Sequence, residues 1–564
     1  MSRRTIVLDA DSNAGLETVQ SLGRGGVAVD AASPDECIAF SSKYVTGKHR
    51  QADVTQDATF TAWIRALDSK YQYSLVVPST ERSLLAMRRM ERNDPVRLKA
   101  VLPTDEALDI ALDKQRTWKL AKALGIAVPE CILIDSLDNV PDARYPVVLK
   151  TKKSLLLSES GLVPGSVALI RHPEARLDFL RRYLPHGPVQ QQAWVSGHGL
   201  GIEFLYRQGE AVWHFAHERV HEGSLWGGAS SYRRSIAPPK DLFLAAKRLL
   251  DELKWHGVGM VEFRVDQNGE FFLMEINPRL WGSLALAIDA GVDFPMGLLG
   301  IAEGQTLPSQ PGYRKHYYAR NIVDDIPWQL ANLRADRMDP TLRTRNPFAA
   351  LAEFSRPLIG RESWDFFDWR DLAVTASQLR QVATHILRTA TYRWRRRRLA
   401  RYLIRHHARQ FRRRSHRKEI QNVLFLCYGN ICRSPFAAEL ARVKLAQYRV
   451  QSAGLDAGNQ ERRTPEEIVE VARTKGIDLS NHHSIRVTDE HVRWADLILV
   501  MDLDNYTSLV RQWPEAALRT DMLGLFAAPP CLSISDPYGA PAAEASQIFD
   551  TILTSLSGLE SWLQ

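Results

Sequence analysis

A cysteine and an arginine six positions apart, Cys427 and Arg433, have the types and spacing in this chain that best suit chemistry. Four apolar residues typical of a buried strand precede the cysteine, and a Ser-Pro pair after the arginine opens a helical pattern. Such a strand, loop and helix N-terminus form an anion site, because loop N–H groups and the helix dipole converge there. The arginine can grip a phosphate, and the same field favours thiolate at the cysteine. The expected chemistry is phosphate-ester hydrolysis through a cysteinyl-phosphate.

The residues between these two, which we expect to form a phosphate-binding loop, are Tyr428, Gly429, Asn430, Ile431 and Cys432. Glycine and asparagine tolerate the left-handed backbone angles that such a loop needs. Ser434 is expected to cap the following helix, with Pro435 in its first position. The whole segment, Cys427-Tyr-Gly-Asn-Ile-Cys-Arg-Ser-Pro435, resembles the signature loop of low-molecular-weight protein tyrosine phosphatases.

The resemblance covers roughly the last 145 residues, the size of one α/β domain. It includes Asp536-Pro537-Tyr538-Gly539, which is similar to that family's acid loop. The resemblance implies that Cys427 is the nucleophile, that Arg433 holds the phosphate, and that Ser434 hydrogen-bonds the thiolate and eases its departure. It implies that Asp536 protonates the leaving phenolate oxygen and then deprotonates the attacking water. Asn430 would shape the loop, and Tyr538 would flank the entrance for an aryl phosphate.

The same resemblance implies no metal or cofactor, because fixed donors meet the developing charge. Arsenate reductases share the loop, but the thiol-linked type needs two further cysteines that residues 495–510 do not supply. Cys432 leaves two alternatives open. An equivalent cysteine of the family forms a reversible disulfide that protects the nucleophile, whereas the other interpretation is a small hydrophobic residue packed under the loop.

A second site is predicted on a β-hairpin in the first half of the chain. Residues 261–266 alternate as a strand, Asn268-Gly269 is a strong hairpin signal, and residues 271–278 form the return strand. The return strand delivers Glu275 and Asn277 to one face, where Glu262 can meet them from across the hairpin. Two carboxylates and an amide oxygen are hard ligands suited to Mg²⁺ that carries nucleotide phosphates.

The segment 257–283, with Met274-Glu-Ile-Asn-Pro-Arg-Leu-Trp-Gly-Ser283, resembles the metal-binding end of the ATP-grasp superfamily, on the carbamoyl-phosphate-synthetase-like branch. The resemblance covers about residues 1–310. It implies ATP and Mg²⁺ as cofactors, with Glu262, Glu275 and Asn277 as the metal ligands. The residues that it implies for ATP binding are Lys114, Lys150, the adenine hinge Gln192, Ala193, Trp194 and Val195, and Arg279, which would steady a phosphate or acyl-phosphate.

Four further residues, expected in a loop, would face the acceptor or the phosphates: Arg219, Glu222, Gly227 and Gly228. One departure from the superfamily concerns its glycine-rich flap. Residues 152–158 read Lys-Lys-Ser-Leu-Leu-Leu-Ser, without glycine, so the phosphate clamp differs from the usual one.

The expected fold class is α/β in four parts. Residues 1–110 are expected to form a small parallel α/β domain, opened by a βαβ unit, and residues 111–310 an ATP-grasp domain of two α+β subdomains. Residues 311–420 are expected to be a helical, strongly basic connector, and residues 421–564 a Rossmann-like phosphatase domain with a central parallel sheet. Residues 311–390 carry no chemical motif, and their aromatic side chains, at 364, 366, 367 and 369, with Leu372 suggest a helical packing patch.

The basic character of the chain is confined to the connector. Residues 393–418 hold thirteen Lys or Arg and no Asp or Glu, so the formal net charge of +8 becomes −5 without them. Residues 391–418 therefore predict either a basic amphipathic helix on an anionic membrane surface or a solvated helical linker. Nucleic-acid contact is disfavoured, because no recognised fold module accompanies the charge.

Five cysteines in 564 residues are too few for a disulfide framework, and the first residues enter a strand pattern without a signal-peptide core. We therefore expect a cytoplasmic protein, peripheral at the membrane if the connector binds lipid. The sequence predicts a bifunctional enzyme, with hydrolysis of phosphotyrosine or a small aryl phosphate and ATP-dependent joining of an unknown carboxylate and amine. In the alternative, the ATP-grasp half binds ATP without turnover and regulates the phosphatase.

Overall fold

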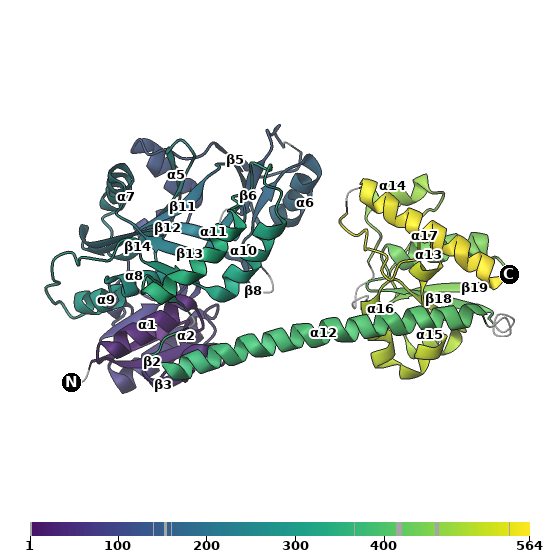
Figure 1. Cartoon of the computed structure of the whole chain (residues 1–564), viewed down its shortest axis with the longest axis horizontal. Helices are drawn as coiled ribbons and strands as arrows, with labels where there is room; N and C mark the ends of the chain where they lie inside the picture. Colours follow the sequence, from purple (N-terminus) through teal and green to yellow (C-terminus); the bar gives the residue numbers. More distant parts are fainter. Residues whose placement is uncertain are drawn as a thin grey trace. The chain divides into compact units, whose positions relative to one another are not determined.

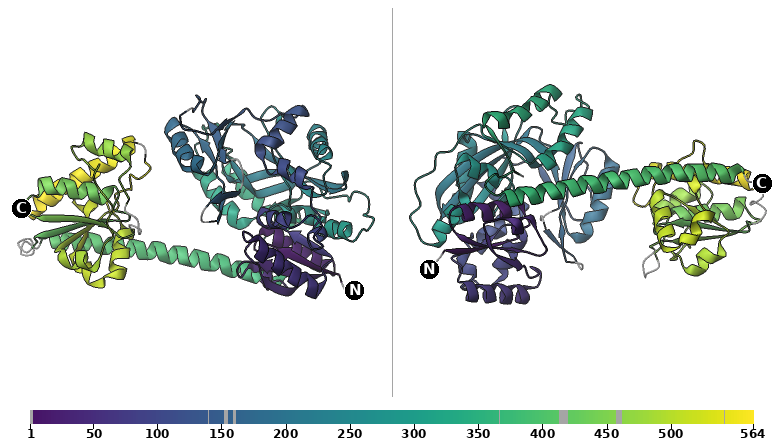
Figure 2. Two further views of the ribbon diagram at one scale, coloured as in Figure 1. Left: turned by 180° about the vertical axis from the view of Figure 1, so that it is seen from behind. Right: turned by 60° about the horizontal axis from the view of Figure 1, so that its bottom comes forward.

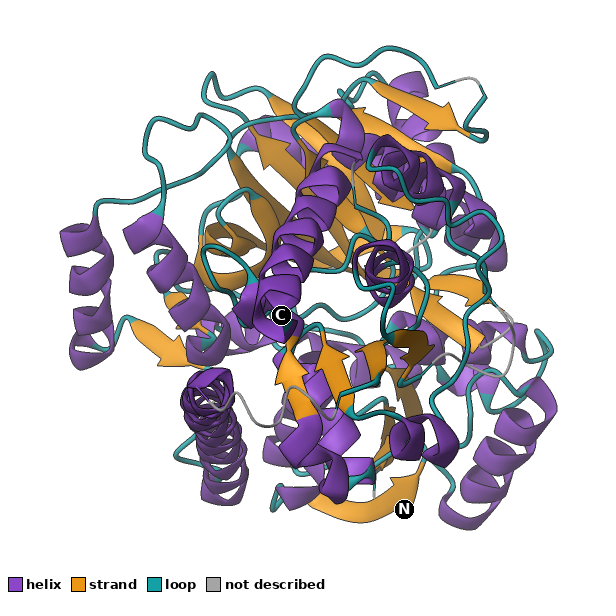
Figure 3. Cartoon of the chain, turned by 90° about the vertical axis from the view of Figure 1, so that its right-hand side faces the viewer, coloured by secondary structure: helices purple, strands orange, loops and turns teal. Residues whose placement is uncertain are grey.

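The computed structural model describes residues 3–138, 140–151, 155–158, 161–365, 367–412, 420–456, 462–540 and 542–564. The chain forms two compact units, Met1–Ala383 and Thr384–Gln564. Strands gather into sheets with helices on their faces (Figure 3), so the expected α/β class is confirmed. The finer boundaries at residues 110, 310 and 420 stay predictions.

The first unit begins with a parallel sheet of order β3-β2-β1-β4. Its strands are β1 (Arg4–Leu8), β2 (Ala28–Ser33), β3 (Val45–Arg50) and β4 (Leu75–Pro78). Alternate residues of a strand point to opposite faces, so Val7 packs under α1 whereas Ile6 and Leu8 pack under the helices on the other face. The helix on the first face is α1 (Asn13–Arg24), and those on the other face are α2 (Asp57–Tyr71) and α3 (Glu81–Arg89), all in purple in Figure 2. The expected βαβ opening is confirmed.

A small antiparallel sheet of order β5-β10-β6-β9 follows two short helices. The elements are α4 (Asp105–Ala111), α5 (Lys114–Ala123), β5 (Cys131–Ile134), β6 (Val147–Thr151), β9 (Val167–Ile170), α6 (Pro173–Tyr183) and β10 (Val189–Ala193). The Asp113 side chain caps α5 by accepting the N–H groups of Gln115 and Arg116. The hairpin of β7 (Leu155–Ser158) and β8 (Gly161–Pro164) contains part of the expected flap, of which residues 152–154 lie outside the described residues.

The largest sheet has the order β15-β14-β11-β12-β13-β16-β17. Its strands are β11 (His198–Arg207), β12 (Glu210–Ser224), β13 (Gly227–Ser235), β14 (Gly257–Val265), β15 (Phe271–Asn277), β16 (Tyr318–Arg320) and β17 (Glu362–Trp364). One face is covered by α7 (Lys240–Glu252), and the other by α8 (Leu284–Ala290) and α9 (Phe294–Ala302). The expected hairpin of β14 and β15 is confirmed, with Gly269 in the left-handed region at φ 86° and Glu262 in register with Glu275.

The region without a motif adds β16 and β17 to this sheet, together with α10 (Ile322–Arg334) and α11 (Pro347–Ala352). The expected helical aromatic patch is wrong. Trp364 ends β17, and Phe367 and Trp369 are 52% and 68% exposed in the loop before α12, which begins at Leu372. Phe366 lies outside the described residues.

The second unit contains a four-stranded parallel sheet of order β19-β18-β20-β21, as expected. Its strands are β18 (Asn422–Cys427), β19 (Arg449–Gly454), β20 (Leu497–Val500) and β21 (Thr520–Met522). One face is covered by α13 (Arg433–Lys444), α14 (Glu466–Thr474) and α17 (Ala542–Leu563). The other face (Figure 1) is covered by α15 (Asp489–Trp494), α16 (Leu503–Gln512) and the last part of α12 (Leu372–Arg412).

No single helix in the described ranges is long and apolar enough to cross a membrane. The helices α8 and α9, bent by 89° at their junction, meet that length and composition test only as a pair.

Candidate active sites

Cys427 ends β18, at the carboxyl edge of the parallel sheet where the loop to α13 begins. Asn430 stands at φ 51° in that loop, in the left-handed region that asparagine tolerates. The neighbouring strand β19 closes on the loop through Gly454, where a Cβ would lie 2.9 Å from the Asn430 nitrogen. The loop therefore needs a residue without a side chain at that position.

The expected helix cap is wrong by two residues. Cys432 occupies the N-cap of α13, and Ser434 lies within the first turn. The Ser434 hydroxyl instead donates to Cys427 Sγ at 3.0 Å, while the Asn430 backbone N–H donates to the same sulfur at 3.2 Å. Asn430 Nδ2 in turn donates to Ser434 Oγ at 3.0 Å, which orients that hydroxyl. Hydrogen bonds that end on the sulfur stabilise its anionic form.

Arg433 is buried beside this sulfur and is held by acidic groups. Its Nη1 donates to Asp502 Oδ2 at 2.8 Å, and its Nη2 donates to Asp536 Oδ2 at 2.7 Å. Burial alone would lower the pKa of Arg433, but the charges of Asp536 and Cys427 and the bond to Asp502 raise it. Its Nε is buried and has no hydrogen-bond partner among the described residues. A buried donor without an acceptor is what an anion bound in the loop would satisfy.

Cys432 is buried in the core beneath the loop. Burial and the nearby charges of Asp536 and Cys427 raise the pKa of its thiol, so it stays protonated at neutral pH. A protonated, buried thiol suits the packing interpretation, and the protective disulfide stays a prediction.

Two tyrosines lie at the rim of the loop with exposed rings. Tyr428 is 56% exposed and donates its hydroxyl to Asp456 at 2.6 Å, and Tyr538, from the acid loop, is 60% exposed. Exposed aromatic faces beside a phosphate site suit a substrate with an aryl group.

The first unit contains a cavity of about 730 Å³, a volume that suits a nucleotide-sized ligand. Most of the expected ATP-grasp residues line it, namely Lys114, Lys150, Gln192, Trp194, Val195, Glu262, Glu275, Asn277 and Arg279. Ala193 is not among the lining residues, and its N–H donates to the Glu130 carbonyl. The hinge residues Gln192, Trp194 and Val195 therefore line the cavity, whereas Ala193 between them contributes a backbone hydrogen bond to its own sheet.

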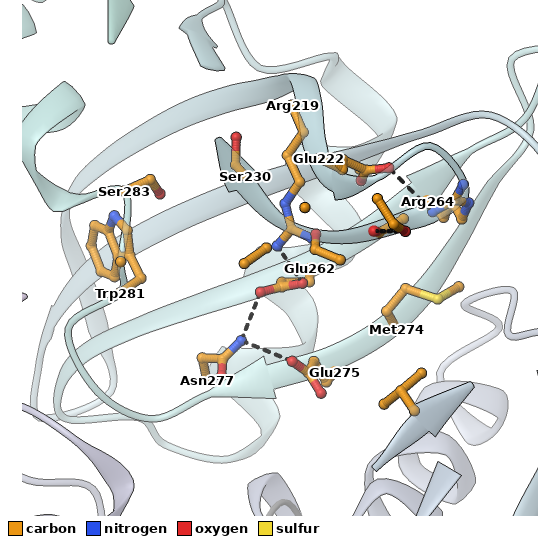
Figure 4. Close-up of a pocket in the computed structure, with 18 of the residues that line it drawn as sticks. Arg219, Glu222, Ser230, Glu262, Arg264, Met274, Glu275, Asn277, Trp281 and Ser283 are labelled. Carbon is orange, nitrogen blue, oxygen red and sulfur yellow. Dashed lines mark hydrogen bonds and ion pairs between the residues drawn. The ribbon is translucent and has the colours of Figure 1, made fainter. Parts of the chain in front are cut away.

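The three expected metal ligands meet at one point of this cavity (Figure 4). Asn277 Nδ2 lies 2.9 Å from Glu262 Oε1 and 3.3 Å from Glu275 Oε1. Within the described residues no three His, Cys, Asp or Glu side chains cluster as a metal site, so the third ligand here would be Asn277, whose amide nitrogen faces the carboxylates and whose amide oxygen lies 3.4 Å from Arg279 Nη2. Two carboxylates and an amide fit Mg²⁺ in donor type. The residues present therefore suit the ion that the fold implies.

Lys150 is the most perturbed base of the cavity. Desolvation, opposed by the carboxylates of Glu275 and Glu262 and aided by the charge of Lys114, lowers the pKa of Lys150 to about 8. Lys114 lies 3.7 Å from Glu275 Oε2, so the two lysines share one acidic partner. The two lysines give this part of the cavity the positive charge that attracts phosphate groups.

The residues expected in a loop lie instead on strands β12 and β13, and all four line the cavity. Arg219 pairs with Glu262 at 2.6 Å, and Arg264 lies 3.7 Å from Glu222 (Figure 4). The site also contains residues that the sequence did not point to. Arg233 binds both carboxylate oxygens of Asp365, at 2.7 and 2.6 Å, and Asp324 lines the same part of the cavity.

These two aspartates come from the region that carries no motif. No short pattern marks Asp365, because its partner Arg233 stands 132 residues earlier in the chain. Only pairing of β16 with β13 brings them to the cavity.

Both units thus have the architecture and the convergent polar side chains of known enzyme classes, a cysteine phosphatase and an ATP-grasp protein. Residues 422–564 match the family model "Low molecular weight phosphotyrosine protein phosphatase", and residues 196–323 match "ATP-grasp in the biosynthetic pathway with Ter operon". The chain belongs to the low-molecular-weight phosphotyrosine protein phosphatase family through its C-terminal domain, which is fused to an ATP-grasp domain.

Two curated relatives are similar to the second unit. A protein-arginine-phosphatase of Geobacillus stearothermophilus is 34% identical over 143 residues, which are 25% of this chain and 95% of the relative. The low-molecular-weight protein-tyrosine-phosphatase Ptp of Acinetobacter johnsonii is 34% identical over 120 residues, 21% of this chain and 82% of the relative. The crystal structure of an L-amino acid ligase from Bacillus licheniformis is 12% identical, with 56% of this chain and 78% of the ligase covered and a TM-score of 0.41.

Proposed function

We propose that the second unit hydrolyses aryl phosphate monoesters, phosphotyrosine above all, through a cysteinyl-phosphate. The observation that carries the proposal is Cys427 Sγ, which receives hydrogen bonds from Asn430 and Ser434 beside the unsatisfied Nε of Arg433. The sulfur attacks phosphorus, the bond between phosphorus and the aryl oxygen breaks as the sulfur–phosphorus bond forms, and Asp536 gives its proton to the leaving phenolate. Asp536 then takes a proton from water, which attacks the phosphocysteine and releases phosphate and the thiolate.

The substrate class is tested by comparing phosphotyrosine with phosphoarginine, because one relative of this unit is a protein-arginine-phosphatase. We expect kcat/KM for phosphotyrosine to be higher, since the exposed rings of Tyr428 and Tyr538 offer an aryl group two contacts. Higher kcat/KM for phosphoarginine would overturn this substrate class while leaving the cysteinyl-phosphate chemistry intact.

Replacing the acid, Asp536→Asn, is expected to act according to the leaving group. Hydrolysis of phenyl phosphate, whose leaving oxygen needs a proton, should fall by about 10²–10³-fold, and that of p-nitrophenyl phosphate by less than about tenfold. The matched control is Asp502→Asn, because Asp502 also pairs with Arg433 but has no role as acid in the proposal. That control should affect both substrates equally. An equal loss for the two substrates in Asp536→Asn would contradict the acid role.

We propose that the first unit uses ATP to activate a carboxylate as an acyl phosphate and passes it to an amine. Lys114 and Lys150 would bind the phosphates, Gln192, Trp194 and Val195 would contact adenine, and Arg279 would steady the transferred phosphate. Mg²⁺, held by Glu262, Glu275 and Asn277, would supply charge neutralisation of the phosphates. Support comes from the meeting of these side chains in one cavity.

Regulation of the phosphatase by ATP binding alone is the second candidate, favoured by the absence of glycine from residues 152–158. The two are separated by a screen of carboxylates with amines for release of ADP and phosphate. Turnover with any pair supports the ligase. ATP binding without turnover across the screen, together with phosphatase rates that change with ATP, supports the regulatory function.

The pKa of Lys150 predicts how ATP affinity varies with pH. The lysine is charged below pH 8 and neutral above it, and only the charged form attracts phosphate, so affinity should fall by about tenfold between pH 7 and pH 9. The measurement is ATP titration by calorimetry across this range. Lys150→Arg keeps its charge throughout and should show a flat profile. A wild-type profile equally flat would contradict the assignment of Lys150 to phosphate binding.

A further inference from the structure

A groove of about 1100 Å³ lies within the second unit, between the last part of α12 and the phosphatase domain. The domain side includes Ile420, Asp496 and Arg519, which precede β18, β20 and β21. In this parallel sheet these positions are the amino-terminal edge, whereas Cys427 stands at the carboxyl edge. The groove is therefore distinct from the catalytic loop.

The groove carries a strong, uncompensated positive charge. Four arginines of α12 line it, Arg398, Arg401, Arg405 and Arg409, and all four are exposed. None of them pairs with a carboxylate of the described residues. On the domain side, Arg519 adds a fifth guanidinium, whose Nε is buried and lacks a described hydrogen-bond partner.

Asp496 is the single carboxylate among the lining residues, and it is already used. Its Oδ2 accepts the N–H groups of Gln421 and Asn422, which ties it to the start of β18. One engaged carboxylate cannot neutralise five arginines, so an anionic ligand is the natural complement.

The face of α12 that packs on the domain differs from the one that carries these arginines. Leu403 is buried in the phosphatase core, Leu399 packs against it, and His407 pairs with Asp521 at 2.7 Å. These positions repeat at helical spacing and use one face of α12, which leaves the arginine stripe on another face, where it lines the groove. Leu399 and Leu403 are therefore not available to lipid.

Other apolar side chains take that place at the rim. Trp394 and Tyr402 line the groove and are 54% and 47% exposed, and Leu518 is 74% exposed on the domain side. Exposed Trp and Tyr beside arginines are typical of a membrane–water interface, and an exposed leucine finds a partner in acyl chains. A nucleic-acid strand would use the rings and the charge but gives no role to the leucine.

We propose that this groove docks the second unit onto an anionic lipid surface, with phosphate headgroups at the arginine stripe and Trp394, Tyr402 and Leu518 at the interface. The catalytic loop, at the other edge of the sheet, stays free to accept substrate. Each arginine near an anionic bilayer adds to binding, and reversal of two charges should weaken binding by at least about tenfold.

The test is co-sedimentation of the full chain with vesicles of phosphatidylglycerol and phosphatidylcholine, and with vesicles of phosphatidylcholine alone. The variant is Arg401→Glu with Arg405→Glu. The matched control is Arg493→Glu with Arg511→Glu, which removes the same charge from exposed arginines that do not line the groove. Hydrolysis of p-nitrophenyl phosphate without vesicles should be unchanged in both and serves as the check of folding.

We expect binding only to the anionic vesicles, a loss of at least tenfold in the groove variant, and a smaller loss in the control. Leu518→Ser should weaken binding to vesicles but not to a single-stranded oligonucleotide. If the groove variant and the control lost vesicle binding equally, net charge alone would explain the binding, and the proposal would be overturned. Groove-dependent binding of the oligonucleotide without binding to vesicles would overturn it in favour of nucleic acid.

Discussion

Replacing Cys427 with serine is expected to lower p-nitrophenyl phosphate hydrolysis by about 10⁴-fold or more. A serine hydroxyl fits between the same two donors but is a far weaker nucleophile than a thiolate at neutral pH. Phosphate binding should survive, because Arg433 and the loop N–H groups remain. The measurements are kcat for the reaction and inhibition or protection by inorganic phosphate.

The matched control is Cys432→Ser, which changes the neighbouring buried cysteine of the same loop. This variant should keep activity within about tenfold, since its thiol is protonated and receives no role in the reaction. If Cys427→Ser retained more than one hundredth of the wild-type kcat, the nucleophile would be misassigned. A loss in Cys432→Ser as large as in Cys427→Ser would show that loop integrity, and not the attacking sulfur, was measured.

Replacing Glu275 with glutamine is expected to abolish the benefit of Mg²⁺ for ATP binding in the first unit. The change keeps the size of the side chain but removes one of two carboxylates at the point where Asn277 and Glu262 meet. Mg²⁺ depends on such charges, so affinity for ATP with Mg²⁺ should fall by at least about tenfold. Any ligase turnover found in the screen should fall by at least about 100-fold. Affinity for ATP without Mg²⁺ should change much less.

The control for this variant lies on the same hairpin. Glu270→Gln removes a carboxylate from the exposed turn between β14 and β15, outside the cavity. It should leave the Mg²⁺ dependence of ATP affinity at the wild-type value. Wild-type Mg²⁺ dependence in Glu275→Gln would contradict the assignment of this residue as a metal ligand.

The parts that could be predicted from the sequence are those whose residues are close together in the chain. The phosphatase loop places Cys427, Asn430 and Arg433 within seven consecutive residues, and a strand and a helix position all of them. The same holds for Glu262, Glu275 and Asn277, because a hairpin has a fixed register once its turn is recognised. Local sequence patterns therefore predict these site residues without knowledge of any tertiary contact.

The errors arise where tertiary contacts outweigh local preference. Ser434 has the type and position of a helix cap, yet its hydroxyl bonds the sulfur, and Cys432 takes the cap position without a side-chain hydrogen bond. The Arg233–Asp365 pair joins residues 132 apart and has no sequence signature. The apolar residues of α12 were consistent with lipid or protein, and only the packing of Leu403 on the sheet distinguishes the two.

Because Arg433 forms an ion pair with Asp536, the proposed acid and the substrate phosphate would compete for the same guanidinium group. In the proposed mechanism, a substrate phosphate that bonds Nη2 of Arg433 would displace the Asp536 carboxylate, which would then be free to turn toward the departing oxygen. In that mechanism the acid would be positioned for proton transfer only after the phosphate is bound. Without substrate, Asp536 is paired with Arg433, so the proposed mechanism would couple binding of the phosphate to positioning of the acid that assists its cleavage.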